Sequence, residues 1–330
     1  MGDSASKGEK ALFQENNVST IAIRIYRKYG ILLILIVMFI ISALVSSNFL
    51  RPQNLVNILR ASASTMILAC GMTLLIISGM IDLSGGSTLT LAGCISVGVM
   101  ASTGNPFLGF SCGIITGAII GWANGFLITR FSLLPFIGTL AMMNVLKGLI
   151  NIYTKGSPIL GVGSMTWLGQ GYIGPAPVPI MIMLICVVIF FCLLSYSKLG
   201  LYAYAIGGNS NAALASGINI NRQKRIIFLV HGIMAGLAGV VMMSRLNSGQ
   251  PSIGNAGYEF DAIVAAVVGG TSLNGGIGSV VGTLIGVLIV SLINNIMVLL
   301  NIPSGYQFVV KGVLIAAAVI LDNVTRKVKT

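Results

Sequence analysis

Charge is what this sequence has least of. Only 8% of its 330 residues are Asp, Glu, Lys or Arg, against about 25% in soluble domains. The shortage is greatest for acids, of which there are seven, whereas 55% of the residues are hydrophobic. A water-soluble surface cannot be built from this composition. Apolar runs suited to crossing about 30 Å of hydrocarbon recur from Ile31 onward, which predicts an integral membrane protein.

Signatures of phosphate and metal chemistry are also missing. A P-loop holds phosphates with Gly-x-x-x-x-Gly-Lys-Ser/Thr, and this chain contains no Gly-Lys dipeptide. The single histidine, His231, lies near the start of an apolar run with no Cys, Asp or Glu close in sequence. A metal site or a catalytic triad would therefore lack partners there. We expect no enzyme activity, no metal site and no cofactor bound by this chain.

The cysteines show no C-x-x-C pair or similar metal-binding spacing. All five lie inside or at the edge of apolar segments, which predicts small buried side chains: Cys70, Cys94, Cys112, Cys186 and Cys192.

The formal charge of +12 does not indicate nucleic acid, because the basic residues form no aromatic-interleaved patch. We expect the lipid bilayer, and no nucleic acid, as the surrounding partner.

The apolar runs predict an all-α polytopic membrane protein with about ten transmembrane helices, in a range of eight to ten. The predicted spans are 31–47, 61–79, 86–103, 107–129, 134–152, 178–196, 226–244, 258–270, 278–300 and 307–322. The eighth is short enough for a half-helix or a re-entrant segment. About 30 mixed residues precede the first run, which favours an uncleaved first span over a signal peptide.

The basic residues favour one side of the predicted membrane. With the N-terminus inside, the inner segments hold thirteen of the nineteen Lys and Arg residues, in line with the positive-inside rule. Lys147 and Lys311 fall within or beside spans. The outer segments hold the other four: Arg51, Arg60, Lys155 and Arg245. An even number of spans places both termini in the cytoplasm.

This topology predicts a simple division of the chain. Residues 1–29 form a cytoplasmic tail, residues 30–325 form a single membrane domain, and residues 326–330 form a second cytoplasmic tail. The longest cytoplasmic connection within the membrane domain spans about 197–225.

Glycines recur at every fourth position in two of the predicted spans, which aligns them along one ridge of each helix. The fourth span carries Gly109, Gly113, Gly117, Gly121 and Gly125, and the ninth carries Gly278, Gly282 and Gly286. Small residues at this spacing let helix backbones approach closely in a membrane. We expect both helices to be central and their glycines to serve packing.

Two glycine-interrupted stretches resemble each other, residues 81–87 and residues 271–277. Both contain Leu, a small polar residue and Gly-Gly, which makes Ser84 and Asn274 equivalent positions. Paired glycine breaks in the two halves of a transporter point to its pathway, because unwound backbone exposes polar groups there. Ser84 and Asn274 are therefore candidate pathway residues.

Three of the seven acids flank or enter apolar runs: Asp82, Glu259 and Asp261. Such carboxylates usually face the protein interior or water, so all three are candidate pathway residues. Two interpretations stay open for Asp82, namely capping or interior hydrogen bonding, and contact with the solute. Glu259 and Asp261 lie beside the outer boundary of the eighth span, where solvation is an alternative.

The long cytoplasmic connection contains a predicted short helix at about 210–216. Asn209 or Ser210 can cap its start, alanines favour its body, and Gly217 can end it in the left-handed conformation. A rigid knob of this kind suits the transmission of force from a soluble partner. An ordinary connector between spans is the alternative.

The combination and order of several motifs resemble the permease subunits of ribose and galactoside ABC importers of bacteria. The matching stretches are 79–84, 205–209 with Ala212, Ala213 and Gly217, 257–259, 269–278, Gln307 and 311–312. The resemblance covers nearly everything after about Gly30. One departure is Met80, which stands where many relatives have a second glycine.

The resemblance implies two permease copies, or two related permeases, beneath an extracytoplasmic sugar-binding protein in the bacterial inner membrane. Separate cytoplasmic ATPase subunits would bind ATP and Mg and drive transport. The segment 207–217 then resembles the coupling helix that docks on the ATPase, with Gly207, Gly208, Asn209, Ala212, Ala213 and Gly217 as candidate contacts.

Other functions remain to be distinguished. An ion-gradient-driven secondary transporter would carry carboxylates deep in its spans, whereas the acids here lie at segment ends. An ABC permease for an amino acid, a membrane enzyme and a structural scaffold are further alternatives.

Overall fold

The computed structural model describes residues 30–327, which form a helical bundle. The predicted tail 1–29 and residues 328–330 lie outside this range. The first helix is Gly30–Val45. The helices that follow are α2 (Pro52–Ile77), α3 (Gly85–Thr103), α4 (Pro106–Arg130), α5 (Pro135–Thr154), α6 (Thr166–Gln170), α7 (Val178–Tyr196), α8 (Lys198–Gly208), α9 (Ser210–Ala215), α10 (Ile220–Leu246), α11 (Tyr258–Val268), α12 (Val280–Leu299) and α13 (Ser304–Lys327). Two 3₁₀ turns, Gly163–Met165 and Pro251–Asn255, join longer elements.

The prediction of ten membrane helices is confirmed in outline. Seven described helices are long and apolar enough to cross a membrane, and Gly30–Val45 and Ser304–Ala317 are shorter apolar helices. The eighth predicted span is α11, which has only 11 residues and is therefore half of a spanning length. One small departure from an all-α fold is an antiparallel pair of strands, β1 (Tyr172–Ile173) and β2 (Ala176–Pro177).

Two helices begin earlier than the apolar runs predict. Helix α2 starts at Pro52, a residue preorganised for a first turn, and continues through polar positions that the hydropathy pattern excludes. Helix α10 starts at Ile220, where the Asn219 side chain accepts a hydrogen bond from the backbone N–H of Arg222 at 3.0 Å. Polar first turns lie outside an apolar core, so hydropathy alone misses them.

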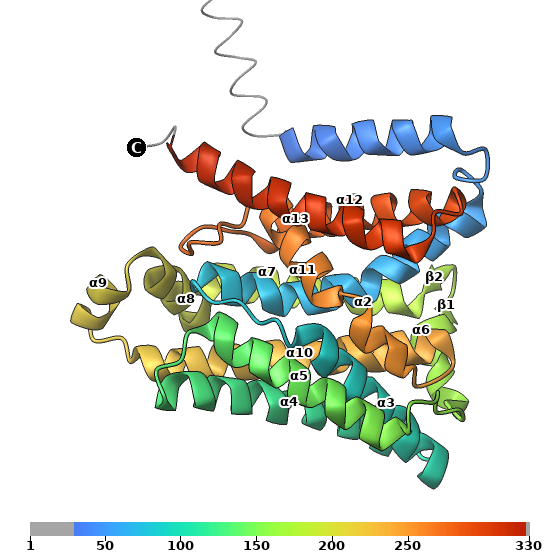
Figure 1. Cartoon of the computed structure of the whole chain (residues 1–330), viewed down its shortest axis with the longest axis horizontal. Helices are drawn as coiled ribbons and strands as arrows, with labels where there is room; N and C mark the ends of the chain where they lie inside the picture. Colours follow the sequence, from blue (N-terminus) through green and yellow to red (C-terminus); the bar gives the residue numbers. More distant parts are fainter. Residues whose placement is uncertain (1–29, 328–330) are drawn as a thin grey trace, which may run out of the picture.

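Helix α2 forms the centre of the bundle (Figure 1). Of its most hydrophobic 18 residues 89% are buried inside the protein, against 28% for α4 and 44% for α12. The prediction that both glycine-ridged helices are central is therefore wrong. A glycine ridge fixes one close contact, and the rest of α4 faces outward through side chains such as Ile119 and Trp122.

The glycine ridge of α4 packs directly on the backbone of α10. A Cβ added at Gly117 would overlap the carbonyl oxygen of Gly232, and one at Gly121 would overlap that of Phe228. Gly113 meets Val240 in the same contact. Backbone therefore approaches backbone across this contact, as small residues at this spacing allow.

The second ridge departs from its prediction in one residue. Gly282 and Gly286 of α12 lie against the backbone of Gly269 and Ala265, at the end of α11. Gly278 precedes α12, whose first turn is capped instead by Ser279. It therefore packs as a loop residue against Ile77 and Thr271.

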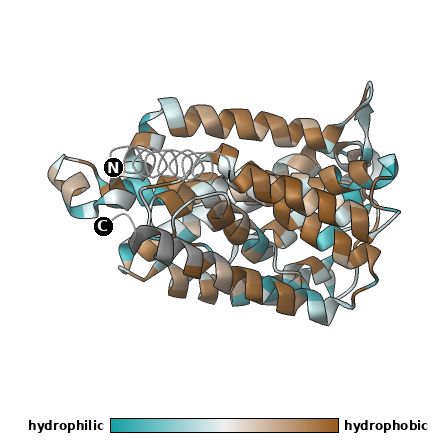
Figure 2. Ribbon diagram, turned by 90° about the horizontal axis from the view of Figure 1, so that it is seen from above, coloured by the Kyte–Doolittle hydropathy of each residue, from teal (hydrophilic) through white to brown (hydrophobic). Residues whose placement is uncertain are grey.

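The two ends of the bundle differ from its middle in polarity. Figure 2 shows hydrophobic ribbons along the length of the helices and hydrophilic residues gathered at the two ends. Helices α8 and α9 and the C-terminal end of α13 lie at one end, and α6 with the β1–β2 pair lies at the other (Figure 1). We call the first the knob end.

The cysteines differ in burial according to the face of the helix on which they lie. Cys70, Cys94 and Cys186 are buried, as predicted, but Cys112 is half-buried and Cys192 is exposed. Both exceptions lie on membrane helices that are buried on one face, so their apolar surroundings include the bilayer side. No group of three or more metal-ligating side chains occurs among the described residues.

Candidate functional site

Three glycine-containing segments meet where the connection between α7 and α10 touches the bundle. A Cβ at Gly207 would overlap the carbonyl oxygen of Ile77, and one at Gly275 would lie 2.8 Å from the Cα of Gly207. The backbone N–H of Gly276 donates to the same Ile77 carbonyl at 2.8 Å. We call this contact of Ile77, Gly207, Gly275 and Gly276 the glycine junction. It joins the end of α8 to the end of α2 and to the second glycine-interrupted stretch, residues 271–277.

A side-chain bond reinforces the glycine junction. The hydroxyl of Tyr204 on α8 donates to the carbonyl oxygen of Gly278 at 2.7 Å. Asn274 lies in the same segment and is exposed. The structure therefore places this predicted pathway residue beside the knob end, apart from Glu259 and Asp261.

The predicted short helix of the cytoplasmic connection is present as α9, Ser210–Ala215. Asn209 caps it by accepting a hydrogen bond from the N–H of Ala212 at 3.0 Å, and Gly217 follows with φ +81°. Residues 207–217 form a knob at one end of the bundle. Ala213 is only 3% exposed, whereas Leu214 is 61% exposed. Leu214, which the sequence does not single out, is therefore the apolar side chain that the knob presents outward.

Asp82 is buried just before α3. Its Oδ1 accepts hydrogen bonds from the backbone N–H and from the hydroxyl of Ser84, both at 2.6 Å. Asn124 of α4 donates to the Ser84 hydroxyl at 2.8 Å and to Asp82 Oδ2 at 3.3 Å. These bonds fix the first glycine-interrupted stretch to α4. Contact of Asp82 or Ser84 with a solute stays a prediction.

His231 has a partner that its sequence neighbourhood does not reveal. Its Nε2 lies 3.5 Å from Asp82 Oδ2, and both residues are at most 2% exposed. The ring fits because Gly71 and Gly85 flank it, and a Cβ at Gly71 would lie 2.7 Å from its Nδ1. His231 has no acidic residue close to it in the sequence, but the fold brings Asp82 beside it.

This cluster contains Ser, His and Asp without forming a catalytic triad. A triad needs the serine hydroxyl to donate to the histidine, so that the imidazole takes its proton. Here Ser84 donates to Asp82. Residues 109–113 read Gly-Phe-Ser-Cys-Gly, which fits the Gly-x-Ser-x-Gly pattern of hydrolases, but they lie inside α4 and not in the strand-to-helix turn that the pattern requires.

Glu259 and Asp261 are buried in the first turn of α11, at 3% and 5% exposure. The alternative that they are solvated is therefore wrong. The Glu259 carboxylate lies against Gly86, where a Cβ would overlap its Oε2. That oxygen has no hydrogen-bond partner within the described part of the chain.

Asp261 forms an ion pair across the helices. Lys311 of α13 donates to Asp261 Oδ2 at 2.8 Å and to the carbonyl oxygen of Ala256 at 3.2 Å. Asn294 of α12 donates a side-chain hydrogen bond to the same carboxylate. Three helices are thereby joined by one buried acid.

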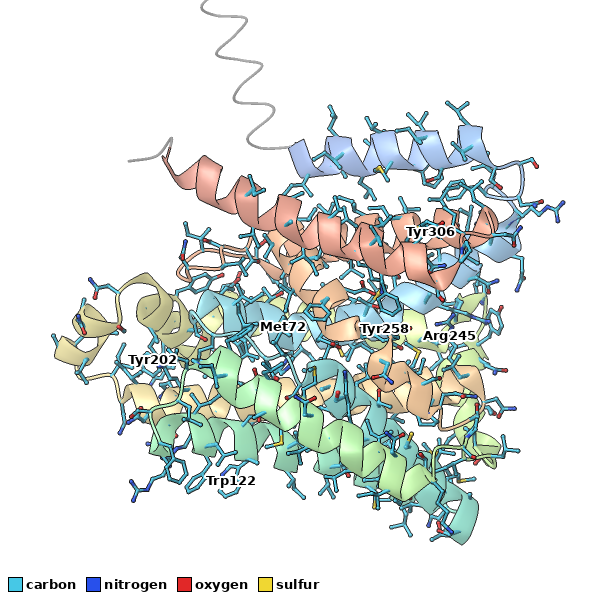
Figure 3. All side chains as sticks on the ribbon, viewed as in Figure 1. Met72, Trp122, Tyr202, Arg245, Tyr258 and Tyr306 are labelled. Carbon is cyan, nitrogen blue, oxygen red and sulfur yellow. The ribbon has the colours of Figure 1, made fainter. Side chains whose placement is uncertain are left out.

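Two cavities share Lys311. One, of about 250 Å³, lies between α5, α11 and α13 and is lined by Lys147, Glu259, Phe260 and Lys311 among others. The other, of about 640 Å³, lies between α2, α11, α12 and α13 and reaches Arg245 and Tyr258. Figure 3 shows Arg245 and Tyr306 at the end of the bundle away from Tyr202 and the knob.

Comparison with known proteins gives concordant matches. Residues 54–319 match a family model described as branched-chain amino acid transport system / permease component. The ribose import permease protein RbsC of Bacillus subtilis (strain 168) is 45% identical over 302 residues, which cover 91% of this chain and 94% of that protein. The Escherichia coli (strain K12) protein of the same name is 41% identical over 297 residues, 88% of this chain and 92% of that protein.

A more distant relative carries a different solute in its name. The L-arabinose transport system permease protein AraH of Escherichia coli (strain K12) is 36% identical over 310 residues, which cover 93% of each chain. No solved structure matches the chain.

Proposed function

The chain belongs to the family of branched-chain amino acid transport system permease components, and we propose that it forms the translocation pathway of an ATP-driven monosaccharide importer. The relatives over most of its length are named for ribose and arabinose. Its composition and helices make it a multi-pass membrane permease, and the sugar specificity proposed here rests on those relatives.

The observation that carries this proposal is the contact of the knob with the end of α2 and with the second glycine-interrupted stretch. The knob presents Leu214 outward for a soluble partner, and the glycine junction joins it to Ile77 and to Gly275–Gly276. Backbone atoms are in direct contact there, so we expect a displacement of the knob to displace the end of α2 and residues 275–276. An ordinary connector between spans needs no such contact.

The sequence contains no P-loop, which supports a motor on another polypeptide. We propose a separate cytoplasmic ATPase that binds ATP and Mg and docks on the knob. In this proposal an extracytoplasmic sugar-binding protein delivers the solute at the opposite end. The chain would lie in the bacterial inner membrane with the knob and both termini on the cytoplasmic side, in keeping with its basic residues.

A second permease copy, or a paralogue, is expected to cover the cavity between α5, α11 and α13. Lys147, Glu259 and Lys311 line that cavity, and charged side chains in a membrane face protein or water and not lipid. The outer faces of α5 and α13 expose apolar residues such as Ile152 and Val313. A second permease on these faces would enclose the charged cavity as a pathway between subunits.

Uptake by reconstituted protein tests the proposed function. Vesicles containing the permease with its ATPase and binding protein are expected to accumulate labelled ribose or arabinose only when ATP is hydrolysed. Accumulation driven by an ion gradient, without ATPase or binding protein, would contradict the proposal.

A variant of the knob tests the docking site. Leu214→Asp introduces a charge at the exposed apolar side chain and is expected to abolish capture of the ATPase in a pull-down, with membrane insertion intact. Ser132→Asp, at an exposed position between α4 and α5, adds the same charge outside the knob and should leave capture unchanged. Equal capture by both variants would remove the docking assignment.

An amino-acid importer is the second candidate, because the family description names branched-chain amino acids. Competition separates the two. Unlabelled ribose or arabinose should inhibit uptake of the labelled sugar, whereas leucine should not.

A further inference from the structure

The larger cavity lies at the end of the bundle where the solute would arrive. It is lined by the first half of α2, the C-terminal end of α12 and the first turns of α11 and α13. The knob lies at the other end (Figures 1 and 3). We call this cavity of about 640 Å³ the vestibule. Its size is within the usual range of small-molecule sites.

The lining of the vestibule is rich in neutral polar groups. It includes four asparagines, one glutamine, three hydroxyl residues and two aromatic rings: Asn54, Asn57, Asn294, Asn295, Gln307, Thr65, Ser291, Ser304, Tyr258 and Phe308. Carboxamides both donate and accept hydrogen bonds, as the hydroxyls of a sugar do. Aromatic rings offer flat apolar surface for the C–H face of a sugar ring. A lipid tail would offer these groups no hydrogen bond.

The charged groups of the vestibule are Asp261, Lys311 and Arg245, and the single acid among them is already paired. Asp261 is the one carboxylate on the lining formed by the described residues. It already accepts hydrogen bonds from Lys311 and Asn294. The ammonium group of an amino acid therefore finds no free anion there.

Part of the amide lining is held in place before any solute arrives. The side chains of Asn54 on α2 and Asn295 on α12 bond reciprocally, with N···O distances of 2.9 and 3.2 Å. Asn54 also donates to the carbonyl oxygen of Phe49 at 2.9 Å. Preorganised polar groups lose less entropy when a ligand binds.

We propose that the vestibule is a polyol-binding site within a single permease subunit, where a monosaccharide rests on its way from the binding protein. The buried Lys311–Asp261 ion pair forms part of its wall, and Lys311 separates it from the smaller cavity at the subunit face. This inference rests on the proposed function for the identity of the solute. It adds a site that lies apart from the interface between two permeases.

Protection of an introduced thiol tests the site. Ser304→Cys places a reactive group on the lining of the vestibule, in a full-length chain whose non-buried Cys112 and Cys192 are replaced by Ser. The complete transporter is reconstituted in nanodiscs and labelled with a charged thiol reagent. Ribose or arabinose at millimolar concentration is expected to slow labelling severalfold, and leucine is expected to have no effect. Asn221→Cys at the knob end is the control and should show no protection.

A second variant measures the contribution of one amide. Asn57 lines the vestibule and is exposed, so Asn57→Leu should leave the fold intact. It is expected to raise the ribose concentration for half-protection about two- to tenfold, as loss of one neutral hydrogen bond would. An unchanged half-protecting concentration would contradict the assignment of Asn57 to the site.

The outcomes separate this inference from the proposed function. Ribose uptake driven by ATP without any protection at Ser304→Cys would overturn the vestibule as a binding site and leave the importer standing. Equal protection by leucine would overturn its selectivity for polyols. Protection without ATP-driven uptake would keep the polyol site and remove the importer.

Discussion

The contact between α4 and α10 and the region of α11, α12 and α13 are held together in opposite ways. The first brings backbone against backbone at Gly117 and Gly232, which have no side chains to keep the two helices apart. The second contains a buried ion pair, two cavities and an amide pair. Polar side chains are costly in a membrane unless they have partners or water. The contrast indicates a fixed frame on one side and a solute-handling side on the other.

The largest stability effect is expected at the ion pair. Lys311→Met leaves the Asp261 carboxylate buried without its cation, and breaking a buried pair in this way costs about 3–5 kcal/mol. Lys311 is 17% exposed, so the lower end of that range is expected. The thermal unfolding temperature of the purified permease measures it. Lys311→Met combined with Asp261→Leu should recover most of the loss, because no unpaired charge remains. A double variant less stable than the single would contradict this account.

The next effect is expected at the glycine contact. Gly117→Ala adds a Cβ where Gly232 leaves no room, and overpacking of this kind costs about 1–3 kcal/mol. Gly148→Ala is the matched control, because a Cβ added at that position of α5 would have no neighbouring atom within 4 Å outside the helix's own backbone. The control should keep or slightly raise stability, since alanine favours a helix over glycine. Equal unfolding temperatures for the two variants would show that the ridge does not fix the frame.

The smallest effect is expected at the amide pair on the solute-handling side. A double-mutant cycle of Asn54→Ala and Asn295→Ala should give a coupling of about 0.6 kcal/mol, the average for hydrogen bonds between membrane helices. A coupling free energy as large as the loss of stability in Gly117→Ala would mean that the amide pair also holds the helices together.

The spans could be predicted from the sequence because each apolar run is long and bounded by Gly, Pro or Asn. Their starts at Pro52 and Ile220 could not, since the first turns there are polar. The sequence did not predict the central position of α2 either. Hydropathy reports how apolar a helix is, and it does not report whether protein or lipid surrounds it.

The sequence identified the acidic candidate residues by their residue type, but it did not identify the side chains with which they interact. Asp261 pairs with Lys311 and Asp82 lies beside His231 only because the fold brings distant helices together. The vestibule was missed because its asparagines are scattered over α2 and α12, where each reads as an ordinary polar residue at a helix end. A single sequence contains no signal for such convergence.

The central claim is that the knob moves the end of α2 and the second glycine-interrupted stretch through the glycine junction. The most direct test is the ribose taken up per ATP hydrolysed, in vesicles containing the complete transporter with Gly207→Ala in the permease. A Cβ there would overlap the Ile77 carbonyl, so we expect normal ATPase capture and a large loss of uptake per ATP. Gly208→Ala, with no atom within 4 Å, should keep the wild-type ratio. An unchanged ratio for Gly207→Ala would contradict the claim.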